Sequence, residues 1–205
     1  MGLSVTAYMG LLLSVGCYRL VEVRISSQHQ RELAARGIAK APEKCFAFMV
    51  LLHIGILASA ALEVLLVHRP FIAILALSMG LLFVLANLLR WWVILTLSGH
   101  WNIQVMASTA IGVVTRGPYR WIRHPNYVAV VVELLALPLI HSAWFTAVWG
   151  GVAHIWVLRR RISVEEQVLL NDPVYRRVMA FKPRFIPRLI SKPSSSTSPA
   201  KTEPD

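Results

Sequence analysis

Four apolar runs, each long enough to cross a lipid bilayer, account for about half of this 205-residue chain. They cover residues 3–23, 45–67, 71–97 and 128–158. Because a transmembrane helix needs only about 20 such residues, the last run has room for two helices. Pro138, followed by His141 and Ser142, provides the break between them. We therefore predict an all-α integral membrane protein with about five transmembrane helices, the last two forming a helical hairpin, at residues 3–23, 45–67, 71–97, 126–139 and 143–161.

The composition and charge support a membrane location. Apolar residues make up 56% of the chain, charged residues only 15%, and the mean hydropathy is +0.58, which excludes an ordinary soluble domain. The net charge of +11 comes from Lys and Arg in the first loop, near residues 116–123 and from residue 159 onward. Such residues favour the cytoplasmic side, so we expect the amino terminus outside and the carboxy terminus in the cytoplasm. Anionic membrane lipids are a sufficient partner for this positive charge, and we expect no nucleic-acid partner.

A polar and aromatic segment at residues 117–127 interrupts the apolar pattern. It reads Gly-Pro-Tyr-Arg-Trp-Ile-Arg-His-Pro-Asn-Tyr, and Pro125 falls where the next helix is predicted to begin. Proline suits the first helical turn, whose amides have no partner within the helix. His124 and Asn126 would flank an electropositive helix start that suits an anionic group of a ligand. The alternative is a juxtamembrane loop in which Tyr and Trp anchor the interface and arginines face the cytoplasm.

Ionisable residues inside the apolar runs form a second group of candidates, because a charge in lipid is costly and usually faces a protein interior or a wet cavity. They are His53, Glu63, Arg90, Glu133, His141 and His154. Arg90 and Glu133 are the best candidates for a cavity, whereas each histidine alone more often has a structural role. The histidines lack metal-ligand spacing, so we predict no metal.

The carboxy-terminal part contains a charged stretch and a tail. If the last predicted helix continues beyond the membrane, Arg161 and Glu165 lie one turn apart, either as a surface ion pair or as a charged wall over a pocket. Residues 182–187, Lys-Pro-Arg-Phe-Ile-Pro, resemble a segment that packs back on the protein surface. Residues 191–205 are rich in Ser, Pro, Lys and Thr, so we predict one domain over residues 1–190 and a disordered tail.

Three motifs together carry a resemblance to a known family: Gly117-Pro118-Tyr119, Arg123-His124-Pro125-Asn126-Tyr127 and Glu165-Glu166. In this combination the chain resembles the isoprenylcysteine carboxyl methyltransferase and phospholipid methyltransferase family, membrane enzymes that use S-adenosylmethionine. The resemblance runs from about residue 102 to residue 187. It implies that the cofactor site is lined by Gln104, Ile111, Gly112, Val113, Val114, Tyr119, His124, Pro125, Asn126, Tyr127 and Glu165. It also associates Arg161 with the substrate. Asn171-Asp172-Pro173-Val174-Tyr175 departs from the Phe-Gly-x-x-Tyr that is usual in this family.

The residue types agree with that cofactor. The helix start with Arg123 or His124 suits the carboxylate of S-adenosylmethionine, and Glu165, with its neighbour Glu166, suits the ammonium. The rings of Tyr119 and Tyr127 suit the adenine and the sulfonium. We expect a cytoplasmic pocket formed by the 99–127 loop and the carboxy-terminal segment. Methyl transfer depends on alignment more than on acids and bases, so Arg161 would orient an anionic acceptor and Glu133 would act as base for a hydroxyl acceptor.

The methyl acceptor is less constrained than the donor. The short chain and the Arg-His-Pro-Asn-Tyr form resemble bacterial members of the family, some of which O-methylate alkylresorcinol or alkylpyrone lipids. We therefore expect a lipophilic acceptor oxygen, reached from a bacterial plasma membrane. Phospholipid N-methylation remains open, as does an NADPH-dependent membrane sterol or steroid reductase, which shares the Arg-His-Pro-x-Tyr segment. A membrane scaffold or small transporter is the non-enzymatic alternative, and the oligomeric state is left open.

Overall fold

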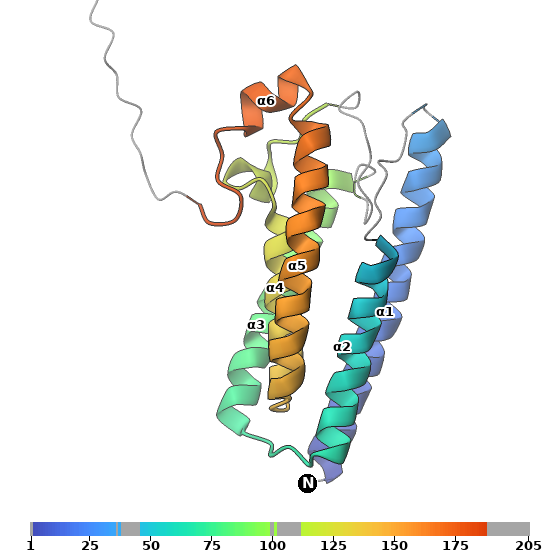
Figure 1. Ribbon diagram of the computed structural model, residues 1–205, viewed down its shortest axis with the longest axis vertical. Coiled ribbons are helices and arrows are strands. Elements are labelled where there is room, and N and C mark those ends of the chain that lie inside the picture. The colour runs from blue at the N-terminus through green and yellow to red at the C-terminus, as the bar shows by residue number, and fades with distance from the viewer. Residues whose placement is uncertain (1, 36, 38–45, 99–100, 102–111, 188–205) are drawn as a thin grey trace, which may run out of the picture.

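The computed structural model describes residues 2–35, 37, 46–98, 101 and 112–187, and this part of the chain is helical without a strand. The helices are α1 (Gly2–Ala35), α2 (Phe46–Leu66), α3 (Ala73–Leu97), the short 3-10 helix η2 (Gly117–Arg120), α4 (Pro125–Leu139), α5 (Trp144–Leu169) and α6 (Pro173–Met179). Helices α3, α4 and α5 run side by side, α2 contacts both α5 and α1, and α6 lies beyond the end of α5 (Figure 1). The long helices therefore form one bundle, and α6 covers one end of it.

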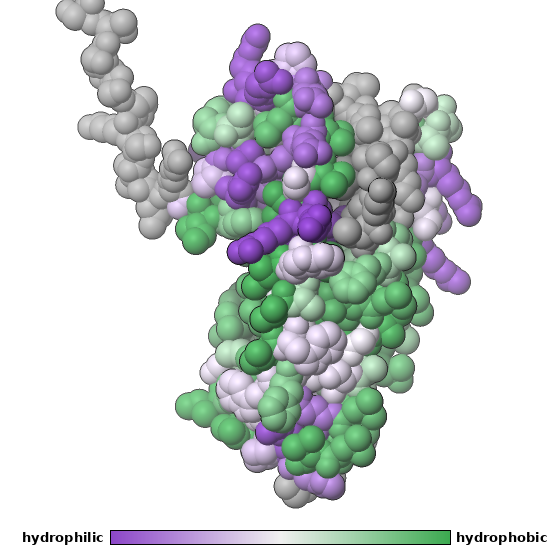
Figure 2. All heavy atoms as spheres, in the orientation of Figure 1, coloured by the Kyte–Doolittle hydropathy of each residue, from purple (hydrophilic) through white to green (hydrophobic). Residues whose placement is uncertain are grey.

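Apolar side chains face outward along this bundle, as expected for a protein solvated by lipid. Leu13, Ile74 and Leu77 are more than 70% exposed, and Val148 and Val152 of α5 are more than 65% exposed. Figure 2 shows this apolar surface along the length of the bundle and hydrophilic residues gathered toward the end that carries α6. Within the described residues α1, α2 and α3 are long and apolar enough to span a membrane, and α4 is a shorter apolar helix. The chain is thus an integral membrane protein, while five transmembrane helices remain a prediction.

The helix boundaries follow the predicted segments except at two ends. Helix α1 continues past the apolar run to Ala35, because residues 24–35 contain neither Gly nor Pro and several good helix formers. Gly37, with φ +76°, follows in the left-handed conformation that commonly ends helices. Helix α5 likewise continues past residue 161 to Leu169. Both helices therefore carry polar residues beyond the apolar part of the bundle.

The α4–α5 hairpin forms where the sequence predicts a break. Pro138 lies inside the last turn of α4, and its carbonyl accepts a hydrogen bond of 3.0 Å from the amide of Ala143. Ser142 completes the turn with φ +56°. At the start of α5, Glu63 of α2 accepts hydrogen bonds of 2.8 Å from both the amide and the hydroxyl of Thr146. A carboxylate at a helix N-terminus satisfies unpaired amides and the helix dipole, so Glu63 anchors the hairpin to α2.

Small residues allow α5 to approach its neighbours closely. A Cβ added to Gly150 would come within 2.9 Å of Ile56 in α2, and one added to Gly151 within 2.9 Å of Leu135 in α4. Close helix contacts through small residues are a usual means of association inside membranes. The position of the polar end of α5, where the predicted motif lies, depends on this packing.

Gly117 begins the segment that leads into α4, and no other residue type fits there. Its φ is +58°, and an added Cβ would lie 2.5 Å from Thr96 Oγ1 and 3.2 Å from Trp92 Nε1. We expect Gly117→Ala to lower the free energy of unfolding by about 2–4 kcal/mol through backbone strain and overpacking. Thermal unfolding in detergent measures this. Gly80→Ala is the control, because an added Cβ there meets nothing within 4 Å. Equal melting temperatures for the two variants would contradict the expectation.

Candidate functional site

Two motifs that are about 40 positions apart in the sequence meet at the polar end of the hairpin. The hydroxyl of Tyr127, in the first turn of α4, donates a hydrogen bond of 2.5 Å to Glu165 Oε2 near the end of α5. His124 Nε2, just before α4, lies 3.1 Å from Glu166 Oε1. His124 also stacks on the ring of Tyr127, with the ring centroids 5.4 Å apart. The Arg-His-Pro-Asn-Tyr segment and the Glu-Glu pair therefore form one cluster.

Glu166 is the most highly coordinated member of this cluster. Its carboxylate accepts hydrogen bonds of 3.0 and 2.6 Å from Nε and a terminal nitrogen of Arg184. A terminal nitrogen of Arg123 lies 3.1 Å away on the other side. Burial alone would raise the pKa of Glu166, but the hydrogen bonds from Arg184 and His124 and the charge of Arg123 bring that pKa below its ordinary value. The ionised carboxylate of Glu166, in α5, thus links the start of α4 to the segment after α6.

The segment after α6, residues 182–187, packs across the start of α4 as the sequence predicts, and we call it the strap. The amide of Arg123 donates a hydrogen bond of 3.0 Å to the carbonyl of Pro183, and the amide of His124 donates one of 3.0 Å to the carbonyl of Arg184. Lys182 Nζ donates to the carbonyl of Tyr119 at 2.7 Å. The strap therefore occupies both amides that immediately precede α4.

Glu165 remains more accessible than Glu166. Its side chain is 25% exposed, whereas that of Glu166 is 10% exposed. Burial and, secondarily, the charge of Glu165 raise the pKa of Tyr119, so the phenol is neutral at physiological pH. The buried Oδ1 of Asn126 has no hydrogen-bond partner among the described residues. An accessible carboxylate and an unsatisfied amide oxygen, both beside tyrosine rings, can bind a cationic and hydrogen-bonding ligand.

Arg161 points toward this cluster from one turn earlier in α5. It is buried, its guanidinium carbon lies 5.9 Å from the centroid of the Tyr127 ring, and it contacts the sulfur of Met49 in α2. A positive charge is thus held on one side of Tyr127, while Glu165 lies at its hydroxyl. The Tyr127 side chain therefore contacts a positive charge over its ring and a negative charge at its hydroxyl.

Glu133 lies in a different place from the other predicted residues. It is fully buried in α4, about 9 Å along the helix axis from Tyr127, and it pairs with Arg19 of α1. Arg90 of α3 lies 4.0 Å from its other oxygen and forms a two-pronged pair with Glu22. Arg19 also lies 2.5 Å from Glu22. We call these four residues the buried charge cluster. Its contacts join α1, α3 and α4, so they give Glu133 a structural role.

The remaining predicted positions differ in their local structure. Pro125 is buried as the first residue of α4. Gly112, Val113 and Val114 form an irregular segment before η2, and Gly112 has φ +95°. Gln104 and Ile111 lie outside the described residues. Sequence reasoning did not identify Arg184, although it identified the segment that carries it, because nothing in a Pro-Arg-Phe pattern indicates which carboxylate the arginine will meet.

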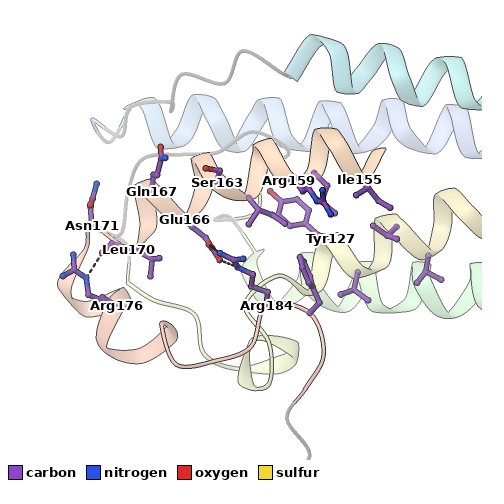
Figure 3. Close-up of a pocket in the computed structure, with 16 residues that line it drawn as sticks. Tyr127, Ile155, Arg159, Ser163, Glu166, Gln167, Leu170, Asn171, Arg176 and Arg184 are labelled. Carbon is purple, nitrogen blue, oxygen red and sulfur yellow. Dashed lines mark hydrogen bonds and ion pairs between the residues drawn. The ribbon is translucent and has the colours of Figure 1, made fainter. Parts of the chain in front are cut away.

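A cavity of about 1030 Å³ opens between α4 and α5 on the face covered by the strap (Figure 3). Of the predicted site residues that the structure describes, only Tyr127 and Glu166 line it. The full lining is Tyr127, Val128, Val131, Val132, Ile155, Leu158, Arg159, Ile162, Ser163, Glu166, Gln167, Leu170, Asn171, Arg176, Arg184 and Phe185. We call this cavity the α4–α5 groove. Glu165 and Asn126 are not part of it.

The fold and the motif cluster define a helical membrane protein with a polar site at the end of a helix hairpin. The model of the isoprenylcysteine carboxyl methyltransferase family matches residues 74–171, from α3 to the end of α5. This part of the chain resembles that family of methyltransferases.

Two bacterial proteins and one eukaryotic enzyme of known structure are similar to this chain. Bacillus subtilis YpbQ is 28% identical over 152 residues, which are 74% of this chain and 89% of YpbQ. A Haemophilus influenzae protein is 23% identical over 152 residues, covering 74% and 88% of the two chains. The structure of the eukaryotic intramembrane Ras methyltransferase ICMT matches with a TM-score of 0.61 at 20% identity, over 85% of this chain. This chain spans about 63% of the length of that enzyme, and the likeness shows the fold.

Proposed function

We propose that this protein is an S-adenosylmethionine-dependent membrane methyltransferase that methylates an oxygen of a lipophilic substrate reached from the bilayer. The observation that carries the proposal is the meeting of Tyr127 with Glu165 at the polar end of the bundle. The match of residues 74–171 to the methyltransferase family supports the reaction class. The donor and acceptor assignments depend on the chemistry of this cluster.

The residues around Glu165 fit the proposed methyl donor. Glu165 would bind its ammonium, and the unsatisfied amide oxygen of Asn126 would accept a hydrogen bond from an amino or hydroxyl group. The faces of Tyr119 and Tyr127 would contact its aromatic and cationic parts. When bound, S-adenosylmethionine supplies an electrophilic methyl group on a positively charged sulfur. The strap and Glu166 would hold the start of α4 in place rather than contact the donor.

Arg161 favours an acidic oxygen as the acceptor. Its buried guanidinium beside Tyr127 would attract a carboxylate, phenolate or enolate and orient it. A protonated amine headgroup would be repelled by the same charge. Because Glu133 is held by Arg19, we propose no base role for it, and an acceptor that ionises readily needs none. Alignment of the acceptor in a site sheltered from water would provide much of the rate enhancement.

The exposed apolar faces of the bundle support a substrate that arrives through the membrane. The cationic residues Arg159, Arg176 and Arg177 in α5 and α6 support the orientation inferred from the sequence, with the cofactor site in the cytoplasm of a bacterial cell. Under this proposal the donor enters from water and the acceptor from lipid. The two would meet at the polar end of α4 and α5.

The proposed function is tested by ligand binding followed by product analysis. We expect the detergent-purified protein to bind S-adenosylmethionine and not NADPH in calorimetric titrations, and to transfer a labelled methyl group into a bacterial lipid extract. Alkali should release the label as methanol from a methyl ester, but not from an enol or phenol ether. Mass spectrometry of the product then identifies the acceptor atom. Binding of NADPH alone would favour a reductase, and a methylated amine would contradict the oxygen assignment.

A further inference from the structure

The α4–α5 groove combines two chemically different halves in one cavity of about 1030 Å³. The half of the groove farther from α6 is lined by Val128, Val131 and Val132 of α4 and by Ile155 and Leu158 of α5. Val131 and Val132 follow Val128 by three and four residues, so the three valines share one face of α4. Because both helices present exposed apolar surface to the bilayer, this half of the groove suits a hydrocarbon chain.

The half of the groove nearer to α6 is polar and positively charged. Arg159, Arg176 and Arg184 line it, and Glu166 is the one acidic residue among the lining side chains. Ser163, Gln167 and Asn171 add hydrogen-bonding groups between them. Figure 3 shows Arg159, Ser163, Gln167 and Asn171 following one another along α5. An anionic headgroup would therefore meet guanidinium groups from α5, α6 and the strap.

Internal contacts hold two of these arginines in position without neutralising the groove. Nε of Arg176 donates a hydrogen bond of 2.9 Å to the carbonyl of Leu170 at the end of α5, an uncharged partner. Arg184 pairs with Glu166, and Glu166 is shared with Arg123 and His124. The single carboxylate thus already faces several cationic or hydrogen-bonding groups. The surplus positive charge of the groove lies with Arg159 and Arg176.

We propose that the α4–α5 groove binds an anionic glycerophospholipid of the surrounding leaflet, with an acyl chain along Val128, Val131 and Ile155 and its anionic headgroup along the cationic row of Arg159, Arg184 and Arg176. Arginine binds phosphate through charge-assisted hydrogen bonds, and anionic lipids are attracted to cationic surfaces near the membrane. An apolar half directly joined to a cationic half matches an amphiphile rather than a soluble anion. The cavity is at the upper end of the size of ligand sites, about 300–1,000 Å³.

This lipid site adjoins the proposed methyl-transfer site, and Tyr127 lies at the boundary between the two. Glu165, Asn126 and Arg161 do not line the groove. Arg184 and Glu166 nevertheless connect the groove to the strap and to His124. A bound phosphate would therefore fasten the strap over the start of α4. The expected consequence is that the strap closes more firmly in an anionic membrane than in a zwitterionic one.

Native mass spectrometry in detergent tests the proposal, with dioleoylphosphatidylglycerol and dioleoylphosphatidylcholine as probes. We expect at least tenfold tighter binding of phosphatidylglycerol, and we expect the Arg159→Ala/Arg176→Ala double variant to lose about 30-fold of that affinity. The matched control is Arg160→Ala/Arg177→Ala. These arginines are the sequence neighbours of the first pair, do not line the groove, and their loss changes the net charge equally.

Several outcomes would overturn the proposal. Equal loss of affinity in the two double variants would indicate non-specific attraction, and equal binding of both lipids would remove the role of the phosphate charge. Displacement of the lipid by inorganic phosphate at the same concentration would indicate a simple anion site. Recovery of phosphatidylglycerol carrying a transferred methyl group would make the groove an acceptor site. An unchanged melting temperature of each variant in phosphatidylcholine verifies folding, and the expectation is independent of S-adenosylmethionine binding.

Discussion

Glu165→Gln is expected to reduce the affinity for S-adenosylmethionine by roughly 30-fold to several thousand-fold, which corresponds to about 2–5 kcal/mol. The carboxylate of Glu165 is partly exposed, lies at the hydroxyl of Tyr127, and is the negative charge of the cluster that Arg184 does not bind. Glutamine keeps the size of the side chain and removes its charge. Isothermal titration calorimetry on detergent-purified protein measures the change.

Tyr127→Phe is the matched control for this experiment. It removes the hydroxyl that donates to Glu165 and keeps both the ring and the carboxylate. We expect a loss of about fivefold or less, because the hydroxyl only orients the carboxylate and the charge that binds the ammonium is retained. If Glu165→Gln retains wild-type affinity while the protein still unfolds cooperatively, Glu165 does not bind the ammonium. A larger loss for Tyr127→Phe than for Glu165→Gln would assign the main contact to the phenol instead.

Glu22→Ala is expected to lower the free energy of unfolding by about 3–5 kcal/mol, because it leaves Arg90 buried without its two-pronged partner. Glu22 and Arg90 are both buried, and they join α1 to α3 inside the apolar part of the bundle. Thermal or denaturant unfolding in detergent measures the effect. Glu32→Ala, at an exposed position further along α1, should change stability little.

A double variant separates a lost charge pair from lost packing. Glu22→Met combined with Arg90→Met removes both charges and keeps apolar bulk, so it should recover much of the stability that Glu22→Ala loses. If the double variant is less stable than Glu22→Ala, the ion pair itself contributes more than its burial costs. Unchanged stability in Glu22→Ala would contradict the structural role of the buried charge cluster.

The sequence predicted the helices well where apolar runs ended in clear signals. Helix α4 begins at Pro125, and the hairpin turns at Ser142, because proline and polar residues interrupt an otherwise continuous run. The end of α1 was not predicted. Its residues 24–35 are polar but favour a helix, and hydropathy indicates where a chain leaves the membrane, not where its helix stops.

The buried partners could not be predicted in the same way. Arg90 and Glu133 were singled out because a charge in lipid needs a partner, but Arg19 and Glu22 lie near the end of an apolar run and resemble interfacial residues. Their pairing depends on how α1 packs against α3 and α4. For the same reason the sequence suggested a base role for Glu133, whereas the structure places the side chain against Arg19.

The sequence by itself determined that this is a helical membrane protein, because local composition controls both helix formation and insertion into lipid. It also predicted that the Arg-His-Pro-Asn-Tyr and Glu-Glu motifs form the functional site. Only the tertiary structure decided that Glu165 faces Tyr127 while Glu166 binds Arg184. Adjacent residues on a helix point about 100° apart, so two neighbouring carboxylates meet different surroundings. Which one is left accessible to a ligand depends on the strap, whose position is set by contacts between residues far apart in the chain.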